Sequence, residues 1–196
     1  MIRFSTLISL ITLGEIQMRS NIQFTIQATE DGKEVFTAPL SYDALADIVS
    51  NYPDHDDSND FFLLAARYPA ATVRENLAYK NHLSAEVLDI LIKDSSVSVL
   101  RNLVRSDAFR EYASHELLDK FINLDIEMAQ SIASYVETFQ EADAVKLANL
   151  LALHEDPSVV ASLADNYRTP KKILKKLLMH TDPHVVQLAK SRLENL

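Results

Sequence analysis

The chain has 196 residues, of which 47% are hydrophobic and 24% charged, and its formal net charge at pH 7 is −9. That much apolar material predicts one large or two small folded units and excludes a disordered chain. Because the sequence contains no cysteine, disulfides, thiolate metal ligands and cysteine nucleophiles are excluded, which fits a cytoplasmic location.

Glycine is almost absent, with Gly14 and Gly32 as the two examples. Phosphate-binding loops and dinucleotide fingerprints need glycine so that backbone amides can approach a phosphate group. The composition therefore disfavours a P-loop NTPase, a Rossmann enzyme or a kinase, and we expect no cofactor. The negative net charge also disfavours long-range attraction of the whole molecule to nucleic acid or anionic lipid.

The first 20 residues contain an apolar run from Phe4 to Leu13. This run is shorter than the roughly 20 residues that a membrane-spanning helix requires, so we expect no bilayer span. We interpret residues 1–20 as a leader or an over-called start, with Met18 as an alternative first residue. A segment packed on the body and an export signal stay open as alternatives.

Residues 21–52 predict a β-hairpin followed by a short helix. "NIQFTIQA" alternates apolar and polar residues, as a half-buried strand does, and Asp31-Gly32 supplies a turn before the return strand. A two-residue loop would place Glu30 opposite Lys33. Ser41 is the expected N-cap of the helix. Because a lone hairpin is marginal in water, we expect the body to cover it or another chain to pair with its edge.

The stretch that follows is strongly acidic. Six aspartates and no Lys or Arg occur in residues 41–60, and Pro53 interrupts the helical pattern. We interpret residues 53–60 as a solvated linker.

From Phe61 onward the sequence alternates longer and shorter helical patterns. Four longer segments share one design, in which apolar pairs recur four residues apart on one helix face. Their apolar sets are Val87-Leu88-Leu91-Ile92, Leu117-Leu118-Phe121-Ile122, Leu147-Ala148-Leu151-Ala152 and Ile173-Leu174-Leu177-Leu178. We expect Ser84, Ser114 and Thr169 to cap three of these helices, with Pro170 at the first helical position of the last one.

The shorter segments carry a motif that is written twice. His-x-Asp-Pro-x-Val-Val begins at His154 and again 26 residues later at His180. We expect Asp156 and Asp182 to be N-caps, each followed by a proline at a position where a missing N–H costs nothing. Helix pairs of this length predict a mainly α fold, a right-handed α-solenoid over residues 61–196 in which neighbouring repeats bury one another's apolar faces.

The repeats resemble the leucine-rich repeat variant family, a relative of HEAT-like repeats. The shared features are Leu at a helix end, Asp-Pro, a Val-Arg or Val-Val step, Leu-Ala, Asn, a Ser/Thr cap and Leu-x-x-Leu, over residues 61–94 and 145–193. Residues 95–144 lack Asp-Pro and carry extra residues near 110–112 and 140–143. The resemblance implies the fold but no particular function, and the cysteine cluster of the family's iron–sulfur member has no counterpart here.

Two histidine-containing stretches, residues 154–156 and 180–184, offer imidazole and carboxylate groups that suit zinc or manganese. Each leading histidine, however, is expected at the C-terminal end of a helix, where a partly cationic ring complements the helix dipole, and each aspartate is an expected cap. We therefore expect no metal site. No strand–turn–helix setting for a nucleophile exists either, so we expect no catalytic residue.

The charge on the exposed side of the four longer helices changes from negative to positive along the chain. Aligning their buried pairs gives one row of Glu86, Glu116, Lys146 and Lys172, and a second row of Asp89, Asp119, Asn149 and Lys175. Residues 168–192 hold seven Lys or Arg and a single acid, Asp182. Such charges are ordinary on solvated helices, but they also suit a two-pole binding surface.

On this basis we expect a non-enzymatic scaffold that binds a protein partner of unknown identity along the longer helices. One alternative is a nucleic-acid-binding solenoid that uses Lys171, Lys172, Lys175 and Lys176. The clustering of these lysines in one repeat, without interleaved aromatic side chains, disfavours it. A second alternative is an enzyme with a hidden site. Self-association through the hairpin edge or through oppositely charged ends also stays open.

Overall fold

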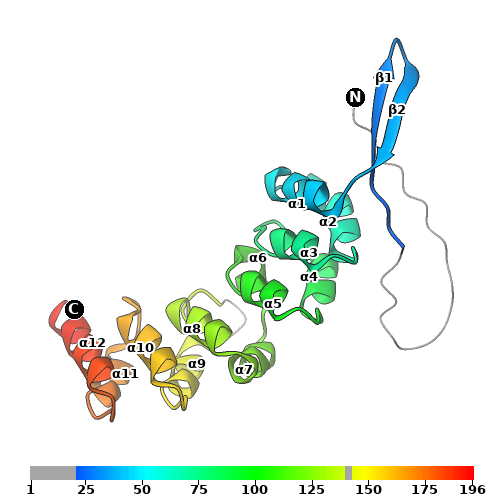
Figure 1. Ribbon diagram of the computed structural model, residues 1–196. Helices are drawn as coiled ribbons and strands as arrows, with labels where there is room; N and C mark the ends of the chain where they lie inside the picture. The colour runs from blue at the N-terminus through cyan, green and yellow to red at the C-terminus, as the bar shows by residue number, and fades with distance from the viewer. Residues whose placement is uncertain (1–20, 140–142) are drawn as a thin grey trace. The chain divides into compact units, whose positions relative to one another are not determined.

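The computed structural model describes residues 21–139 and 143–196, and the predicted leader lies outside them. The described residues are mainly helical, with twelve α-helices, one 3-10 helix and a two-stranded antiparallel sheet (Figure 1). Two compact units divide the chain, one ending at Leu103 and the other running from Val104 to Leu196. The helices of the predicted repeat domain are distributed over both units.

The first unit begins with the predicted hairpin, formed by β1 (Thr25–Glu30) and β2 (Lys33–Pro39). Asp31 and Gly32 form the two-residue turn with φ of 48° and 77°, the left-handed values that this turn requires. The register pairs Glu30 with Lys33, which confirms the predicted loop length. A bulge lies between Ala28 and Thr29 in this register.

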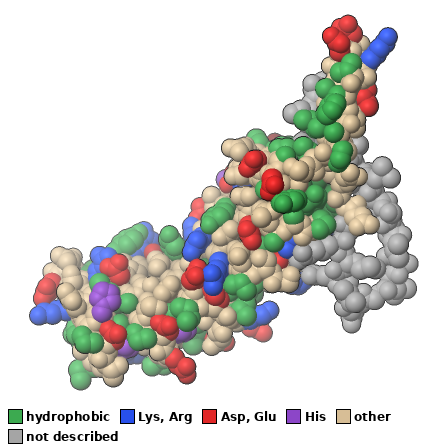
Figure 2. All heavy atoms as spheres, in the orientation of Figure 1, with side chains coloured by type: hydrophobic (Ala, Val, Ile, Leu, Met, Phe, Trp, Pro, Cys, Tyr) green, Lys and Arg blue, Asp and Glu red, His purple; other side chains and the backbone are tan. Residues whose placement is uncertain are grey.

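The hairpin is attached at its base and exposed along its length. Phe24, just before β1, is 3% exposed and packs edge-on against Phe61 with ring centroids 5.7 Å apart. Farther along, Ile26 and Phe36 are 38% and 53% exposed, and Figure 2 shows hydrophobic side chains along the strands with charged ones near the tip. The described body therefore does not cover the hairpin. Pairing with another chain remains a prediction.

The polar face of the hairpin is held by side-chain hydrogen bonds. Gln27 Nε2 donates to Glu34 at 2.5 Å, and the Thr37 hydroxyl donates to the other Glu34 oxygen at 2.6 Å. These hydrogen bonds, Thr37's first, hold the pKa of Glu34 below its usual value. The two strands thus have one cross-linked polar face, and a second face that carries Ile26 and Phe36.

The acidic stretch 53–60, predicted as a solvated linker, is largely exposed and contains helical structure. After α1 (Tyr42–Asn51), whose N-cap is Ser41 as predicted, a short 3-10 helix η1 covers Asp56–Ser58 and α2 (Asn59–Ala66) follows directly. The physical reason is that the side chains bond locally. Ser58 is buried, and its hydroxyl donates to the Pro53 carbonyl at 2.7 Å.

Three further helices complete the first unit, namely α3 (Ala71–Leu77), α4 (Ala85–Leu91) and α5 (Val97–Leu103). Alternate helices lie against one another: α1 packs on α3, α3 on α5, and α2 on α4. Ser84 caps α4 through its hydroxyl, as predicted.

The second unit contains seven helices among its described residues. They are α6 (Asp107–Tyr112), α7 (His115–Leu124), α8 (Ile126–Ser134), α9 (Ala144–Leu151), α10 (Pro157–Asp165), α11 (Lys171–Leu177) and α12 (Pro183–Glu194). Again alternate helices stack, with α8 on α10 and α10 on α12. The extra residues near 110–112 are part of α6, which buries Phe109 against Phe121 of α7 with parallel rings 5.5 Å apart.

Most predicted caps are confirmed, and one is wrong. Ser114, Asp156 and Asp182 accept hydrogen bonds from backbone amides at the starts of α7, α10 and α12, and prolines take the expected first positions of α10 and α12. Thr169 does not cap α11. Its buried hydroxyl donates instead to the Leu163 carbonyl at 2.6 Å, so that Pro170 becomes the N-cap.

The four predicted apolar sets are buried at their centres and less so at their edges. Leu88, Phe121, Leu147 and Leu177 are all at most 3% exposed. Leu178 is 37% exposed, contrary to the prediction, because α11 ends at Leu177 and the chain then turns away. Ile92, Leu117 and Ala152 are half-buried. None of the described helices has the length and hydrophobicity needed to cross a bilayer.

Candidate functional site

The four lysines of α11 share the exposed side of one short helix. Ile173, Leu174 and Leu177 anchor its other side at 1–2% exposure. The lysine side chains therefore all reach solvent; they are Lys171, Lys172, Lys175 and Lys176. The structure places the basic cluster where the sequence predicts it.

The lysines have a neighbour on α9. The prediction that α9 and α11 belong to a longer class of helices is wrong, since they have 8 and 7 residues against 9 and 12 in α10 and α12. Lys176 Nζ donates to the Asn149 side-chain oxygen of α9 at 2.7 Å, and Lys146 of α9 is exposed as well. The aligned rows predicted that Asn149 would lie beside Lys175, so the observed contact is shifted by one residue. Lys172 and Lys175 have no hydrogen-bond or ion-pair partner among the described residues of this unit.

The acidic residues of the predicted rows are divided between the units. Glu116 and Asp119 lie on the exposed side of α7, where Asp119 accepts a hydrogen bond from Asn123 one turn later. Glu86 and Asp89 lie on α4 in the first unit, and Glu86 is 3.5 Å from Arg67 Nη2. The structure thus brings together the lysines of α9 and α11 and leaves Glu86 and Asp89 on a separate unit.

The two histidines proposed as metal ligands act inside turns instead. His154 Nδ1 accepts the Asp156 N–H at 3.0 Å, and His180 Nδ1 accepts the Asp182 N–H at 3.1 Å. Each ring thus lies in the turn that joins one helix to the next and contacts the amide of the capping aspartate. No group of three or more His, Asp or Glu side chains within the described ranges is placed to hold a metal ion.

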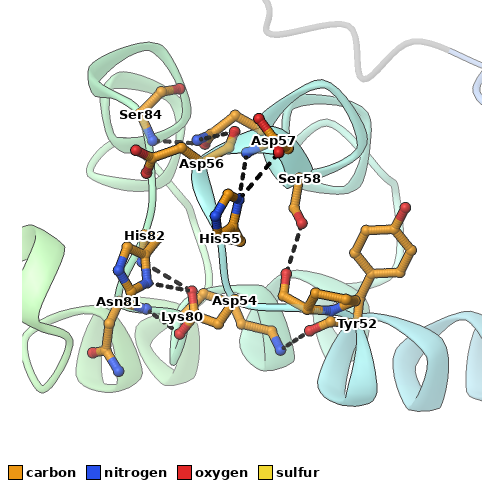
Figure 3. Close-up of polar contacts among 12 residues, drawn as sticks. Tyr52, Asp54, His55, Asp56, Asp57, Ser58, Lys80, Asn81, His82 and Ser84 are labelled. Carbon is orange, nitrogen blue, oxygen red and sulfur yellow. Dashed lines mark hydrogen bonds and ion pairs between the residues drawn. The ribbon is translucent and has the colours of Figure 1, made fainter.

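A polar cluster around Lys80 was missed by the sequence reasoning (Figure 3). Lys80 is 8% exposed, and its ammonium group donates to the carbonyl oxygens of Ser50 and Tyr52, both at 2.8 Å. These carbonyls lie at the C-terminal end of α1, so the lysine satisfies acceptors that a helix end leaves open. Burial lowers the pKa of Lys80, against the opposing effect of the nearby Asp54 carboxylate.

Asp54 holds the other side of this cluster. Its two oxygens accept the backbone N–H groups of Asn81 and His82 at 2.8 and 2.9 Å. Burial opposes its charge, but these two hydrogen bonds and the adjacent His82 ring hold the pKa of Asp54 below its usual value. Lys80 and Asp54 together tie the end of α1 to the turn after α3.

A second buried network joins α3 to the turn before α5. Arg74 Nε and Nη2 donate to the two Asp94 oxygens at 2.5 and 3.1 Å, and the two side chains are only 2% and 4% exposed. Arg74 also donates to the carbonyl oxygens of Tyr68 and Pro69. The sequence did carry one signal for this network. Arg74 occupies the repeat position at which a later repeat has the apolar residue Val160.

Comparison with known protein families, with curated proteins and with solved structures finds no match.

Proposed function

We propose that the chain is a non-enzymatic protein-binding scaffold of the right-handed α-solenoid type, and that the lysine face of α11 and α9 contacts an acidic surface of its partner. The observation that carries this proposal is the set of four exposed lysines on α11. Alternate-helix stacking within each unit supports the solenoid. The likeness of the repeats to the leucine-rich repeat variant pattern supports it as well.

The spacing of the lysines and the position of two of them oppose the stability of α11, although Lys175 and Lys176 lie in its last turn, where the dipole favours positive charge. Lys171 and Lys172 occupy the first turn of α11, where the helix dipole disfavours positive charge. Lys171 with Lys175, and Lys172 with Lys176, are like-charge pairs four residues apart, each of which costs about 0.2–0.5 kcal/mol. A local conflict of this kind is typical of a surface kept for binding.

Protein is favoured over nucleic acid as the partner. The lysines are concentrated on α11, with Lys146 of α9 beside them, whereas single-strand binders line a groove with cations and aromatic side chains. The exposed aromatic residue nearest in sequence, Tyr167, is stacked under Arg168 at 5.3 Å from the ring centroid. A compact cationic patch of this size suits a cluster of carboxylates on a folded protein or an acidic peptide.

The test is partner capture from a lysate with the wild-type chain and a Lys171/Lys172/Lys175/Lys176→Glu variant, each with and without nuclease. We expect the wild type to recover a nuclease-resistant set of proteins that the variant loses. The matched control replaces four other exposed lysines with Glu, so that net charge changes equally; these are Lys33, Lys93, Lys120 and Lys190. The control should recover the same proteins as the wild type.

Two outcomes contradict the proposal. Recovery that nuclease abolishes would assign the lysine face to nucleic acid. Equal loss in the variant and in the control would show that net charge alone, and not the position of the lysines, governs binding.

A further inference from the structure

A groove in the second unit lies between two helix corners. One corner is the junction of α7 and α8 and the other is the turn from α9 to α10, and the space between them is about 740 Å³. Three of its aliphatic side chains are exposed: Leu124 by 50%, Ile126 by 48% and Leu153 by 84%. Exposed aliphatic groups that line a groove mark an interaction surface more often than scattered ones do.

The groove is acidic. Asp125, Glu155 and Asp156 line it, and none of the described residues that line it is Lys or Arg. Hydrogen bonds from Ser158, its hydroxyl first and then its amide, hold the pKa of Asp156 below its usual value, so that this carboxylate stays charged at neutral pH. An occupant that matches the groove must bring an apolar side chain flanked by cations.

The chain itself carries such a segment at the end of α11. Lys172 and Lys175 lie one turn apart on α11, and Met179 follows in the turn after the helix ends at Leu177. Met179 is 87% exposed, and Leu178 beside it is 37% exposed. This segment combines an apolar side chain that suits the groove's aliphatic lining with cations that the lining lacks.

We propose that the groove binds the α11 end of a second copy of this chain, with Met179 against Leu153 and the lysines against the carboxylates. Within one chain the two surfaces do not meet, because Leu153 and Met179 are both more than four-fifths exposed. A second copy satisfies both surfaces at once. This inference rests on the proposed function, since it names the acidic partner of the same lysines.

The charges and the apolar anchor have different tasks in this contact. Opposite charges steer the two surfaces together and fix their orientation, and they weaken as salt is added. Met179 and Leu153 supply the burial that holds the complex, because a few buried anchors carry most of the binding free energy of an interface.

The experiment is sedimentation equilibrium of the full chain over a range of concentrations. The average mass of the wild type should rise above the 22.1 kDa of one chain. Leu153→Glu and Met179→Glu should each weaken association about tenfold or more, because each removes an apolar anchor. Met179→Glu also brings a carboxylate against the acidic groove. Both side chains are so exposed that folding should be unaffected, which circular dichroism checks.

Matched variants make the test specific. Tyr79→Glu replaces another exposed apolar residue, 51% exposed and in the first unit, and should associate like the wild type. A mixture of Leu153→Glu with Met179→Glu should regain association, since one variant keeps the α11 end and the other keeps the groove. Lys172→Glu alone should weaken association, and adding Glu155→Lys should partly restore it.

The inference is overturned if the wild type stays monomeric at every concentration, or if both anchor variants associate like the wild type. A monomeric wild type that still captures other proteins through its lysines would refute self-association and leave the proposed function standing. A wild type that associates with itself but captures no other protein would support self-association and refute binding of a different protein partner.

Discussion

The two units solve the same structural problem with different chemistry. Each turn between stacked helices leaves backbone groups that need partners. In the first unit charged side chains supply them, as Lys80 does for the carbonyls of Ser50 and Tyr52. At the turns before α10 and α12 of the second unit imidazole rings do so, as His154 and His180 accept the amides two residues ahead. In the first unit His55 makes the same contact with the Asp57 amide.

Asp94 in the first unit and His180 in the second accept the same kind of backbone hydrogen bond. Asp94 accepts the Ser96 N–H at 2.8 Å, the same contact two residues ahead that the histidines make. Because the Asp94 side chain is charged and buried, it needs Arg74 as a partner. In the second unit the buried apolar residue Val160 stands at the repeat position of Arg74.

The largest effect should follow from breaking the buried pair. Arg74→Met leaves the Asp94 charge buried without its arginine, and we expect unfolding to become easier by about 3–5 kcal/mol. Urea denaturation measures the loss, and hydrogen exchange should locate it in α3 and α5. Arg67→Met is the control, because its pair with Glu86 is exposed and worth about 1 kcal/mol or less. Similar losses in the two variants would contradict the account.

A smaller loss is expected at Lys80. Lys80→Met keeps most of the aliphatic stem but leaves two acceptors at the end of α1 without their donor, at a cost of about 1–3 kcal/mol. Amide exchange in α1 should accelerate. Lys93→Met, which changes an exposed lysine of the same unit, should leave stability within about 0.5 kcal/mol. An unchanged midpoint for Lys80→Met would show that water replaces the ammonium without penalty.

The histidines should matter less than either cation. His180→Ala removes the acceptor for the Asp182 amide, and we expect a loss of about 0.5–1.5 kcal/mol in the second unit. His180→Asn offers an oxygen in the manner of Asp94 and should recover part of that loss. If His180→Asn loses as much stability as His180→Ala, the ring contributes by packing and not by accepting the Asp182 amide.

An effect of similar size has the opposite sign. Replacing Lys171 and Lys172 with Glu places negative charge in the first turn of α11 and removes two like-charge contacts, so stability should rise by about 0.5–1.5 kcal/mol. Thermal unfolding of the double variant measures this gain. A loss of stability instead would mean that these lysines support the fold, and the argument for a binding surface would lose its basis.

The sequence predicted those parts of the fold that depend on helical periodicity or on local backbone geometry. The Asp31-Gly32 turn, the Ser84 and Ser114 caps and the doubled Asp-Pro starts follow from backbone geometry, so a single sequence suffices to predict them. Thr169 was mispredicted because a hydroxyl can also donate, and a carbonyl at the end of α10 competed for it. The helicity of Asp107–Tyr112 was hidden by its shortness.

Only part of the candidate site could be predicted from the sequence. The lysines of α11 follow from helical spacing, because the buried Ile173 and Leu174 fix which side faces solvent. The groove beside Leu153 was invisible, since a leucine at a helix end is ordinarily counted as core. Arg74 and Asp94 are 20 residues apart, and no local pattern indicates that they meet.

The most direct test of the account is the salt dependence of binding to a captured protein partner, measured for the wild type and for the variant with all four α11 lysines changed to Glu. The account predicts tight binding by the wild type that weakens steeply with added salt, and weak binding by the variant at every salt concentration. Equal affinity of the two proteins, with the same salt response, would contradict it.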